Sequence, residues 1–446
     1  MSLNDLTEKI TRREAKLAVI GLGYVGLPVA ALFAKAGFDV LGVEIKQERV
    51  DKINAGLSPI EGEEPGLAQL LAEQVAQGRL HAAADYETLR ERDVILIDVE
   101  TPVDDQHIPR YEALRAALTQ LAPVLKRGAL VIVESTIAPR TMDTVVRPLL
   151  EEGSGMRVNR DFYLGNCPER VMPGRLLTNL SSLSRVVGGG TPETAQAMIA
   201  LYRLIVQADL DAADWITAEL VKTVENAYRD VQIAFANEVG LICEALGGDV
   251  WTVRELVNKS PQRHMHLPGA GVGGHCIPKD PWLLAHGIQG MDVPLRMVPT
   301  ARAINDGMPA HMVDLLSKAL AQAGVSLAGA RVLVLGYAYL ENSDDTRNSP
   351  SAVLVRLLES LGADVRIHDP YVEGMQGDVV EAAQGADAVV LMVRHQAYNA
   401  LDLPRLRAAM RTPVLVDGRK AVDGRQAREL GFLYWVVGAA SPAAAS

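Results

Sequence analysis

Cysteine is scarce: the 446 residues include only three, Cys167, Cys243 and Cys276. Three cysteines without a CxxC pair cannot build the disulfide framework of a small secreted domain, so we expect a reducing, cytoplasmic location. The first 15 residues are charged and lack the apolar core of a secretion signal. No apolar run is long enough to span a bilayer, so we expect no membrane partner.

Aromatic residues are also scarce, and the chain has no net positive charge. Aromatics make up 4% of the chain, and the formal net charge is -11. Because nucleic-acid binding needs a concentrated basic surface, we expect no nucleic-acid partner. The chain is instead 48% apolar and 22% charged, which is typical of a globular protein with large cores. Its length favours two or three domains.

Short apolar runs alternate with helical patterns in the first half of the chain. We expect strands at 16–21, 39–44, 94–99, 129–134, 162–166 and 184–188. A helix is expected at 26–37, and the sequence Thr191-Pro192-Glu193 is a helix-start signal. Strands separated by helices predict a parallel, doubly wound sheet.

Apolar residues then recur at helical spacing over 212–246, until Gly247 and Gly248 end the pattern. This predicts one long helix or two nearly continuous ones, serving as an inter-domain spine and a dimer interface. The alternative is a buried core helix within one subunit. A second α/β region follows, with strands expected at 331–339, 364–368, 388–393 and 414–417 and a helix at 351–361. The tail at 439–446 is expected to fray.

The sequence GLGYVG at residues 21–26 lies between an expected strand and an expected helix. In the dinucleotide fingerprint, Gly21 permits a tight turn, Gly23 lets a pyrophosphate approach the backbone, and Gly26 lets helix and strand pack closely. The helix N-terminus then offers N–H groups to the anion. Glu44, at the end of the second strand, can bind ribose hydroxyls and would repel a 2′-phosphate. These residues predict NAD as the cofactor.

Hydroxyl side chains follow two further strands, at Thr101 and at Ser135-Thr136. Ligands of open α/β sheets lie beyond the carboxyl ends of the strands, so these hydroxyls can meet the cofactor. The alternative is that they only cap helices or shape turns.

Cys276 lies in the glycine-rich stretch PGAGVGGHCIPKD at residues 268–280. Glycines leave a thiol sterically open, and nearby His275 and Lys279 could lower its pKa and supply thiolate. The alternative is a buried structural cysteine in a turn. His275 and Cys276 lack further ligands at metal-binding spacing, so no metal is expected.

Lys222, Asn226 and Arg229 share one face of the expected long helix. A lysine and an amide on that face can polarise a reacting oxygen. A solvated charged stripe is the alternative.

Read in order, six stretches resemble the UDP-glucose/GDP-mannose dehydrogenase family from about residue 16 to 419: GLGYVG, STI, PER, LVKTVENAYR, GGHCIPKD and DTRNSP. The resemblance implies an N-terminal NAD-binding Rossmann domain at 15–205, a central helical dimerisation domain at 206–310 and a C-terminal UDP-sugar-binding Rossmann-like domain at 325–440. The expected fold class is thus α/β, with two Rossmann-like doubly wound domains joined by a central helical domain with a long helix.

The resemblance also implies residue roles. The catalytic residues would be Cys276, Lys222, Asn226, Asp280, Glu169 and Thr136. The NAD contacts would be Gly21, Gly23, Tyr24, Val25, Gly26, Glu44, Arg49, Thr101, Thr136 and Arg347. The sugar-nucleotide contacts would be Arg170, Val171, Lys222, Asn226, Arg229, Arg263, Gly273, Tyr339 and Arg419. The chain departs from the family pattern in two places: Leu340 follows Tyr339 where the family often has lysine, and Arg263 is displaced by a position from the expected basic residue.

The implied reaction is a four-electron oxidation of a sugar C6 hydroxyl to a carboxylate through a thioester on Cys276, for glycan or surface-polysaccharide precursors. Within the family, the stretch CPERVMPG resembles enzymes acting on UDP-N-acetyl-D-mannosamine. UDP-N-acetyl-D-glucosamine and then UDP-glucose are alternative substrates, and a homodimer, possibly a higher oligomer, is implied. Outside the family, the alternatives are a two-electron hydroxy-acid or polyol dehydrogenase and a catalytically silent nucleotide-sugar-binding regulator.

Overall fold

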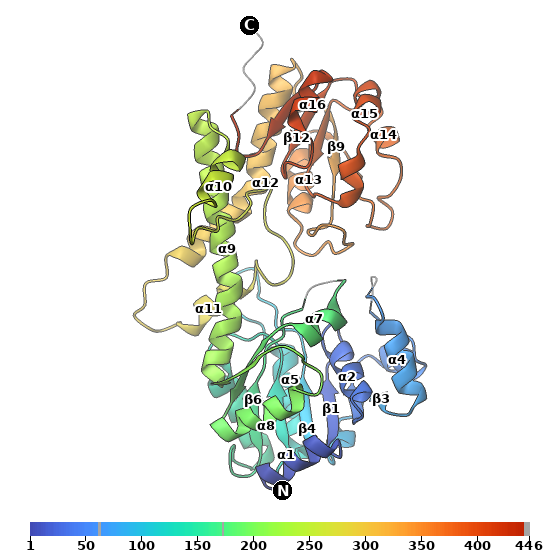
Figure 1. Cartoon of the computed structure of the whole chain (residues 1–446), viewed down its shortest axis with the longest axis vertical. Coiled ribbons are helices and arrows are strands. Elements are labelled where there is room, and N and C mark those ends of the chain that lie inside the picture. Colours follow the sequence, from blue (N-terminus) through green and yellow to red (C-terminus); the bar gives the residue numbers. More distant parts are fainter. Residues whose placement is uncertain (61–63, 172–173, 441–446) are drawn as a thin grey trace. The chain divides into compact units, whose positions relative to one another are not determined.

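The computed structural model describes residues 1–60, 64–171 and 174–440 (Figure 1). It divides into two compact units. Unit 1 comprises residues 1–225 and 282–293, and unit 2 comprises residues 226–281 and those from 294 onward. Of the tail expected to fray, only residues 439 and 440 lie within the described part.

Unit 1 is built on an eight-stranded sheet of order β3-β2-β1-β4-β5-β6-β7-β8. The strands are β1 (Lys16–Ile20), β2 (Asp39–Val43), β3 (Leu80–Ala83), β4 (Val94–Ile97), β5 (Leu130–Val133), β6 (Tyr163–Asn166), β7 (Arg185–Gly189) and β8 (Leu210–Asp214). All neighbours run parallel except β6 and β7, which pair antiparallel. The predicted doubly wound sheet is confirmed, with this one reversed pairing as the exception.

Burial on both faces explains why the central strands are apolar throughout. Along β1, Leu17 and Val19 belong to one apolar cluster, whereas Ala18 and Ile20 belong to another. Successive side chains of a strand point to opposite faces, so each face of the sheet carries its own core.

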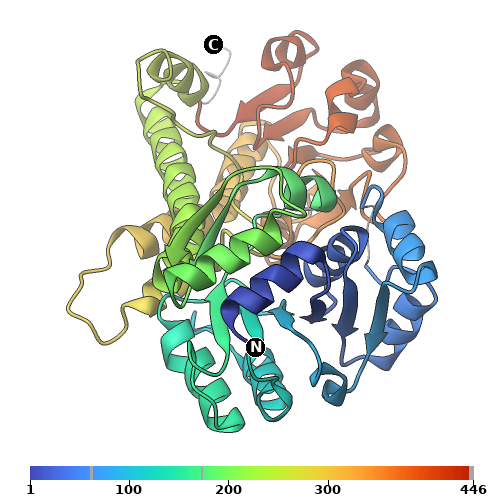
Figure 2. The ribbon, with the colours of Figure 1, turned by 60° about the horizontal axis from the view of Figure 1, so that its bottom comes forward.

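The helices of unit 1 cover these two faces. They are α1 (Leu3–Arg12), α2 (Gly26–Lys35), α3 (Gln47–Asn54), α4 (Leu67–Ala76), α5 (Glu112–Leu121), α6 (Arg147–Ser154), α7 (Leu176–Ser182) and α8 (Pro192–Tyr202), with a π-helical segment, η3, at Met142–Val146. Helix α1 runs alongside α8 (Figure 2). Its Leu6 and Ile10 are fully buried, although the segment is otherwise charged.

Unit 2 contains a five-stranded, wholly parallel sheet of order β10-β9-β11-β12-β13. The strands are β9 (Arg331–Leu335), β10 (Asp364–His368), β11 (Ala388–Leu391), β12 (Val414–Asp417) and β13 (Leu433–Val436). Its helices are α10 (Val250–Val257), α12 (Met297–Gln322), α13 (Pro350–Ser360), α14 (Val379–Ala382), α15 (Leu403–Ala409) and α16 (Gly424–Glu429). The second Rossmann-like sheet is confirmed.

The predicted long helix is one continuous element, α9 (Trp215–Leu246), which contributes residues to both units. It starts three residues later than expected because residues 212–214 belong to β8. It ends at Gly247, whose φ of 83° glycine adopts at little cost. Its apolar side chains are not all buried, since Tyr228 is 62% and Leu246 81% exposed.

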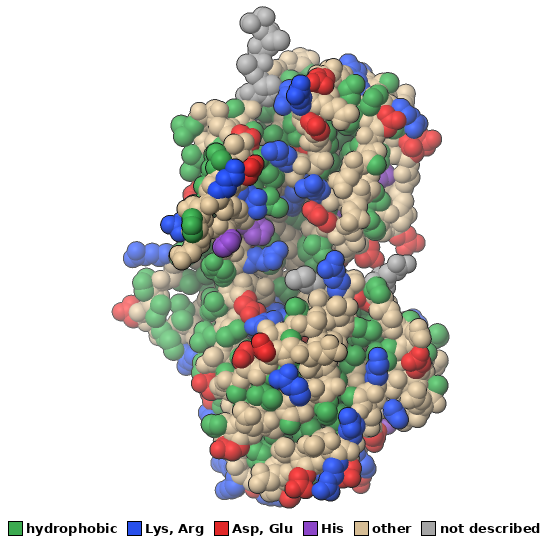
Figure 3. Space-filling model, viewed as in Figure 1, with side chains coloured by type: hydrophobic (Ala, Val, Ile, Leu, Met, Phe, Trp, Pro, Cys, Tyr) green, Lys and Arg blue, Asp and Glu red, His purple; other side chains and the backbone are tan. Residues whose placement is uncertain are grey.

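Charged side chains of both signs are interspersed over the face that Figure 3 shows. Among the described residues, α9 and α12 included, no helix is long and apolar enough to cross a bilayer. The same residues contain no cluster of three or more histidine, cysteine or acidic side chains that could hold a metal ion.

Candidate active site

The three fingerprint glycines occupy three different environments at the carboxyl end of β1. Gly21 has a φ of 92°, and a Cβ there would lie 2.6 Å from the Asp98 carbonyl oxygen. A Cβ on Gly26 would lie 2.0 Å from the Gly21 carbonyl oxygen, whereas one on Gly23 would meet nothing within 4 Å. Gly23 therefore leaves open backbone where a pyrophosphate can approach. Helix α2 has no side-chain cap, so its N-terminal N–H groups suit an anion.

Glu44 and Arg49 join the end of β2 to this glycine turn. Glu44 is 9% exposed and accepts a hydrogen bond from the Lys46 N–H at 3.1 Å. Arg49 Nε lies 3.4 Å from Glu44 Oε2, and Arg49 Nη2 donates to the Leu22 carbonyl at 2.8 Å. Because Glu44 already balances the arginine, this end of β2 suits ribose hydroxyls better than an additional phosphate.

Glu64 is a residue of this region that the sequence analysis did not identify. The Tyr24 hydroxyl donates to its carboxylate, and so do the backbone N–H groups of Gly174, at 2.7 Å, and Leu176, at 3.2 Å. Glu64 thus connects the glycine turn to the start of α7. No local pattern could have indicated this, because its partners are 40 to 112 residues away.

The hydroxyl side chains after β4 and β5 form hydrogen bonds between the two loops that follow these strands. Thr101 donates to the Thr136 carbonyl at 2.5 Å, and Ser135 donates to the Val99 carbonyl at 2.6 Å. Ser135 therefore acts as a turn-shaping residue. Both loops lie at the carboxyl ends of neighbouring strands, where cofactors of such sheets bind.

Glu169 belongs to a buried charge network in unit 1. It is 7% exposed and forms an ion pair with Arg185, which is 2% exposed. Arg185 also lies 3.5 Å from Glu134 Oε1, and its guanidinium carbon is 4.9 Å from the Tyr202 ring centre. Burial raises the pKa of Glu169 to about 7, against the opposing effects of Arg185 and, more weakly, Lys222. Sequence reasoning missed Arg185, whose one signal was a charge inside an apolar strand.

Arg170 is tied to α9. Its Nε donates to Glu225 at 3.1 Å and its Nη1 to the Ser184 carbonyl at 2.6 Å. Its side chain is 25% exposed, so part of the guanidinium is still accessible. Val171 beside it is half-buried.

In unit 2, Cys276 is exposed, whereas Cys167 and Cys243 are buried. The interpretation of Cys276 as a buried structural residue is therefore wrong. The Cys276 carbonyl accepts hydrogen bonds from the Lys279 N–H at 3.1 Å and the Asp280 N–H at 2.8 Å. These bonds lead the loop directly into helix α11 (Asp280–Gly287).

Asp280 is fully buried and links the cysteine loop to α9. Its Oδ2 accepts a hydrogen bond from Asn226 Nδ2 at 2.5 Å, and its Oδ1 lies 3.1 Å from Lys279 Nζ. Three residues expected to be catalytic, Asn226, Cys276 and Asp280, are thus joined through direct bonds and one short loop.

His275 precedes the thiol in the chain and is half-buried. Burial, with the positive charges of Lys279 and Arg347, lowers the pKa of His275 to about 4. Such an imidazole carries no positive charge at pH 7 with which to lower the pKa of the Cys276 thiol. Among these neighbours, Lys279 remains the cation.

The C-terminal loops pack onto the cysteine loop through its glycines. A Cβ on Gly273 or Gly274 would lie 2.6 Å from atoms of Tyr339. Gly274 N–H donates to the Arg347 carbonyl at 2.9 Å, and Arg419 Nη2 donates to the Gly271 carbonyl at 3.0 Å. The structure therefore brings Gly273, Tyr339, Arg347 and Arg419 to one loop.

Two predicted arginines differ in their surroundings. Arg229 is exposed, and its charge joins those of Arg254 and Arg419 in lowering the pKa of His266, for which burial is the largest cause. Arg229 and Arg419 thus both lie near His266 in unit 2. Arg263, in contrast, folds back onto the Pro261 carbonyl at 3.3 Å and is exposed.

Family models match most of the chain. The NAD binding domain of the UDP-glucose/GDP-mannose dehydrogenase family matches residues 15–206, its central domain residues 216–307, and its UDP binding domain residues 333–424. A UDP-N-acetyl-D-mannosamine dehydrogenase of Pyrococcus horikoshii is 39% identical over 95% of this chain and 99% of its own. An NDP-N-acetyl-D-galactosaminuronic acid dehydrogenase of Ralstonia nicotianae is 36% identical, over 90% and 95%.

Solved structures of dehydrogenases with the same kinds of names also resemble this chain. The UDP-D-ManNAc dehydrogenase of Pyrococcus horikoshii superposes with a TM-score of 0.89 at 38% identity, covering 95% of this chain and 99% of that one. The NDP-N-acetyl-D-galactosaminuronic acid dehydrogenase of Methanosarcina mazei gives 0.87 at 35% identity, covering 99% and 98%.

The glycine turn, the carboxylate at the end of β2 and the matched NAD binding domain define an NAD-dependent dehydrogenase. The chain belongs to the UDP-glucose/GDP-mannose dehydrogenase family and is an NAD-dependent UDP-sugar dehydrogenase. The family resemblance, the cofactor and the enzyme class predicted from the sequence are confirmed.

Proposed function

We propose that the protein oxidises the C6 hydroxyl of UDP-N-acetyl-D-mannosamine to a carboxylate, through a covalent intermediate on Cys276. The observation that carries this proposal is the exposed Cys276 thiol on a loop fixed by the buried Asp280, which binds Asn226. Relatives bearing the names of UDP-N-acetyl-D-mannosamine and NDP-N-acetyl-D-galactosaminuronic acid dehydrogenases support an N-acetylhexosamine substrate. We further propose a cytoplasmic location.

Oxidation of an alcohol to an acid removes four electrons, and bound NAD would accept a hydride at each of two oxidations, one molecule per step. The residues present suit that cofactor, because Gly23 leaves open backbone and α2 presents uncapped N–H groups. The first oxidation also releases the C6 hydroxyl proton, which Lys222 or a water molecule takes up. Lys222 and Asn226 would then stabilise the oxygen on which negative charge develops.

Cys276 would next add to the aldehyde carbon, giving a thiohemiacetal. This converts the second oxidation into hydride loss from a tetrahedral carbon and prevents release of a reactive aldehyde. Its product is a thioester, which water hydrolyses to the acid and the free thiol. Asp280, Glu169 and Thr136 are proposed to position or activate that water.

The sugar nucleotide would be held by Arg229 and Arg419, with Gly273 and Tyr339 at the cysteine loop and Arg170 and Val171 after β6. Arg347 is proposed as an NAD contact; Asp345 holds its Nε at 2.9 Å. Arg263 is the weakest member of the set, because its side chain bonds to its own loop.

A substrate panel tests the proposal. Purified protein is incubated with NAD and, separately, the UDP forms of N-acetylmannosamine, N-acetylglucosamine, N-acetylgalactosamine and glucose. We expect the highest kcat/KM for UDP-N-acetyl-D-mannosamine, two NADH per sugar and a product 14 Da heavier by mass spectrometry, since two hydrogens are replaced by one oxygen. One NADH per sugar would contradict the four-electron reaction, and preference for another sugar would replace the assigned epimer.

We propose that Arg185 positions Glu169 and keeps it ionisable. Arg185 favours the Glu169 carboxylate, so replacing it with methionine should raise the pKa of Glu169 above about 7. If the carboxylate activates water, the acid limb of the kcat–pH profile should move to higher pH in Arg185→Met, and Arg185→Lys should move it back. Loss of the buried pair should also lower stability by about 3 to 5 kcal/mol.

Arg92→Met is the matched control for Arg185→Met. Arg92 is 8% exposed and pairs with Asp39 at 3.1 Å. This pair lies at the amino ends of the strands, whereas Glu169 follows the carboxyl end of β6. We expect Arg92→Met to lose stability without moving the acid limb. An unshifted profile in Arg185→Met would remove Arg185 from the mechanism.

A homodimer through α9 is also proposed. Exposed apolar side chains recur every four or seven residues along one stripe, the α9 stripe: Leu220, Val224, Tyr228, Phe235, Ile242 and Leu246. A helix with one apolar stripe can pair with the same stripe of a second copy. In such a two-fold contact, each stripe residue would be buried in both copies. The long helix would thereby anchor the central domain proposed at 206–310, between the domains proposed at 15–205 and 325–440.

Placing a charge in the α9 stripe should dissociate this dimer. Phe235→Glu brings two carboxylates into the apolar contact, so light scattering after size exclusion should give the monomer mass. Glu8→Lys, a charge reversal at an exposed position of α1 outside α9, should remain dimeric. A monomeric wild type, or a dimeric Phe235→Glu, would contradict the proposed interface.

A further inference from the structure

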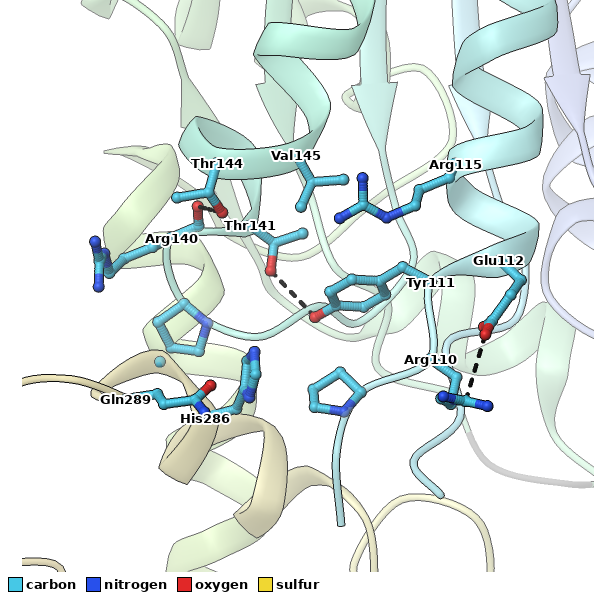
Figure 4. A pocket seen from close by; sticks show the side chains of 13 residues that line it. Arg110, Tyr111, Glu112, Arg115, Arg140, Thr141, Thr144, Val145, His286 and Gln289 are labelled. Carbon is cyan, nitrogen blue, oxygen red and sulfur yellow. Dashed lines mark hydrogen bonds and ion pairs between the residues drawn. The ribbon is translucent and has the colours of Figure 1, made fainter. Parts of the chain in front are cut away.

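Unit 1 contains a pocket that none of the proposed catalytic or cofactor residues lines. Its volume is about 460 Å³. Three segments form its walls: Pro109 and the start of α5, the stretch from Pro139 to Val145, and the end of α11 with Gln289 (Figure 4). This size lies within the range of small-molecule sites, about 300 to 1,000 Å³.

Positive charge gathers around this pocket in a chain with 44 basic and 55 acidic residues. Arg110, Arg115 and Arg140 line it. Arg110 is balanced by Glu112, whose Oε1 lies 3.3 Å from its Nε. The side chains of Arg115 and Arg140 form no ion pair or hydrogen bond with any residue that the structure describes. Two exposed guanidinium groups are therefore available to an anion.

Arg140 occupies a backbone position that favours glycine. Its φ is 77°, and Glu219 fixes the turn by accepting hydrogen bonds from the N–H groups of Arg140 at 2.7 Å and Met142 at 2.8 Å. A non-glycine residue in this region costs about 1 to 2 kcal/mol. Arg140 therefore lines the pocket from a turn whose backbone Glu219 holds in place.

The remaining walls are suited to the body of an organic molecule. The hydroxyls of Tyr111 and Thr141 are hydrogen-bonded to each other at 3.1 Å, and the Tyr111 hydroxyl also accepts a hydrogen bond from the Ala138 N–H at 2.9 Å. These polar groups of the pocket therefore already have partners within the protein. Pro109, Pro139 and His286 add ring surfaces. Burial lowers the pKa of His286, so its ring is neutral at pH 7. Apart from Glu112, which pairs with Arg110, the arginines are thus the charged groups that line the pocket.

We propose that this pocket binds an organic phosphate of sugar-phosphate size. Guanidinium groups bind phosphate oxygens through paired, charge-assisted hydrogen bonds, which either Arg115 or Arg140 can donate; the Arg140 side chain points away from Arg115 (Figure 4). The rings of Pro139 and His286 would contact the organic part. The lining residues are separate from those proposed for catalysis, so binding here is independent of the proposed reaction.

Calorimetric titration of the full-length protein with glucose 6-phosphate tests the proposal. NADH and UDP are present at saturating concentration, so that the cofactor and nucleotide sites are filled. We expect a Kd below about 1 mM. In the double variant Arg115→Gln/Arg140→Gly, affinity should fall at least about tenfold, since two charge-assisted contacts are lost. Glycine suits the φ of residue 140, so this variant should fold.

Arg12→Gln is the matched control, because Arg12 is an exposed arginine on α1, distant in sequence from the pocket lining. It should bind as wild type does. Glucose should not bind, and inorganic phosphate should bind more weakly than glucose 6-phosphate. Absence of binding, equal affinity in the double variant, or equal affinity for inorganic phosphate would overturn the proposal.

A measurement on the wild type avoids any folding defect. Phenylglyoxal modifies accessible arginines, and peptide mass spectrometry locates the adducts. Glucose 6-phosphate should protect Arg115 and Arg140 and leave Arg12 reactive. Equal modification with and without the ligand would refute binding at this pocket.

Discussion

Replacing Cys276 with alanine should abolish uronate formation, lowering kcat roughly a thousandfold or more, as loss of a catalytic nucleophile does. Without the thiol, no thioester can form, so the second oxidation has no covalent intermediate on which to act. The side chain is exposed, so the free energy of unfolding should change by less than about 0.5 kcal/mol. NADH release in the presence of each UDP-sugar, with product mass, measures the effect.

NAD binding should survive in Cys276→Ala, because the glycine turn and Glu44 are untouched; titration of NADH fluorescence checks this. Cys243→Ala is the matched control, a second cysteine removed at a buried site. That variant should lose stability and keep its kcat. Two NADH per sugar at the normal rate in Cys276→Ala would refute the covalent mechanism.

Replacing Asp280 with asparagine should lower kcat by roughly 100- to 10,000-fold, the range for removal of an acid–base group. Asparagine keeps the shape and removes the charge. Asn226 then faces an amide in place of the carboxylate oxygen that it now binds at 2.5 Å, and its orientation is no longer fixed. Lys279, 6% exposed, loses its neighbouring negative charge, so the protein should also be destabilised by about 3 kcal/mol or more.

Asp387→Asn, also in unit 2, is the control that separates the loss of stability from the loss of kcat. Asp387 is also fully buried and also charge-paired, with Arg411, but it precedes β11 at the amino ends of the strands. We expect a comparable loss of stability in urea denaturation with kcat unchanged. If Asp280→Asn keeps at least half of the wild-type kcat, Asp280 has only a structural role.

Strands buried on both faces were predicted closely, because their apolar runs are local and unbroken. The range 414–417 coincides with β12, whose four residues are all buried. Of the four edge strands, β3, β8 and β13 were missed, whereas the range 364–368 coincides with β10. No residue of β8 is fully buried, and its last three residues, 212–214, were assigned to the start of the long helix. Its pairing with β7, and not its own composition, makes it a strand.

Among the helices that were not predicted, α1 and α12 were missed for a related reason. Helix α1 has only Leu6 and Ile10 as fully buried residues, a pattern too short to stand out in a charged segment. Helix α12 is long, but it contains Pro309, which ordinarily argues against a helix interior. In both, packing against other elements outweighs local preference.

The sequence by itself determined the dinucleotide turn, the exposed-cysteine motif, the long helix and the family, since each depends on residues close together in the chain. Only the tertiary structure decided that Glu169 is held by Arg185, that Asp280 binds Asn226 54 residues away, and that His275 is neutral. Burial and long-range partners control charge state and orientation, and neither can be read from local spacing. The paired side chains come from separate elements, which only folding brings together.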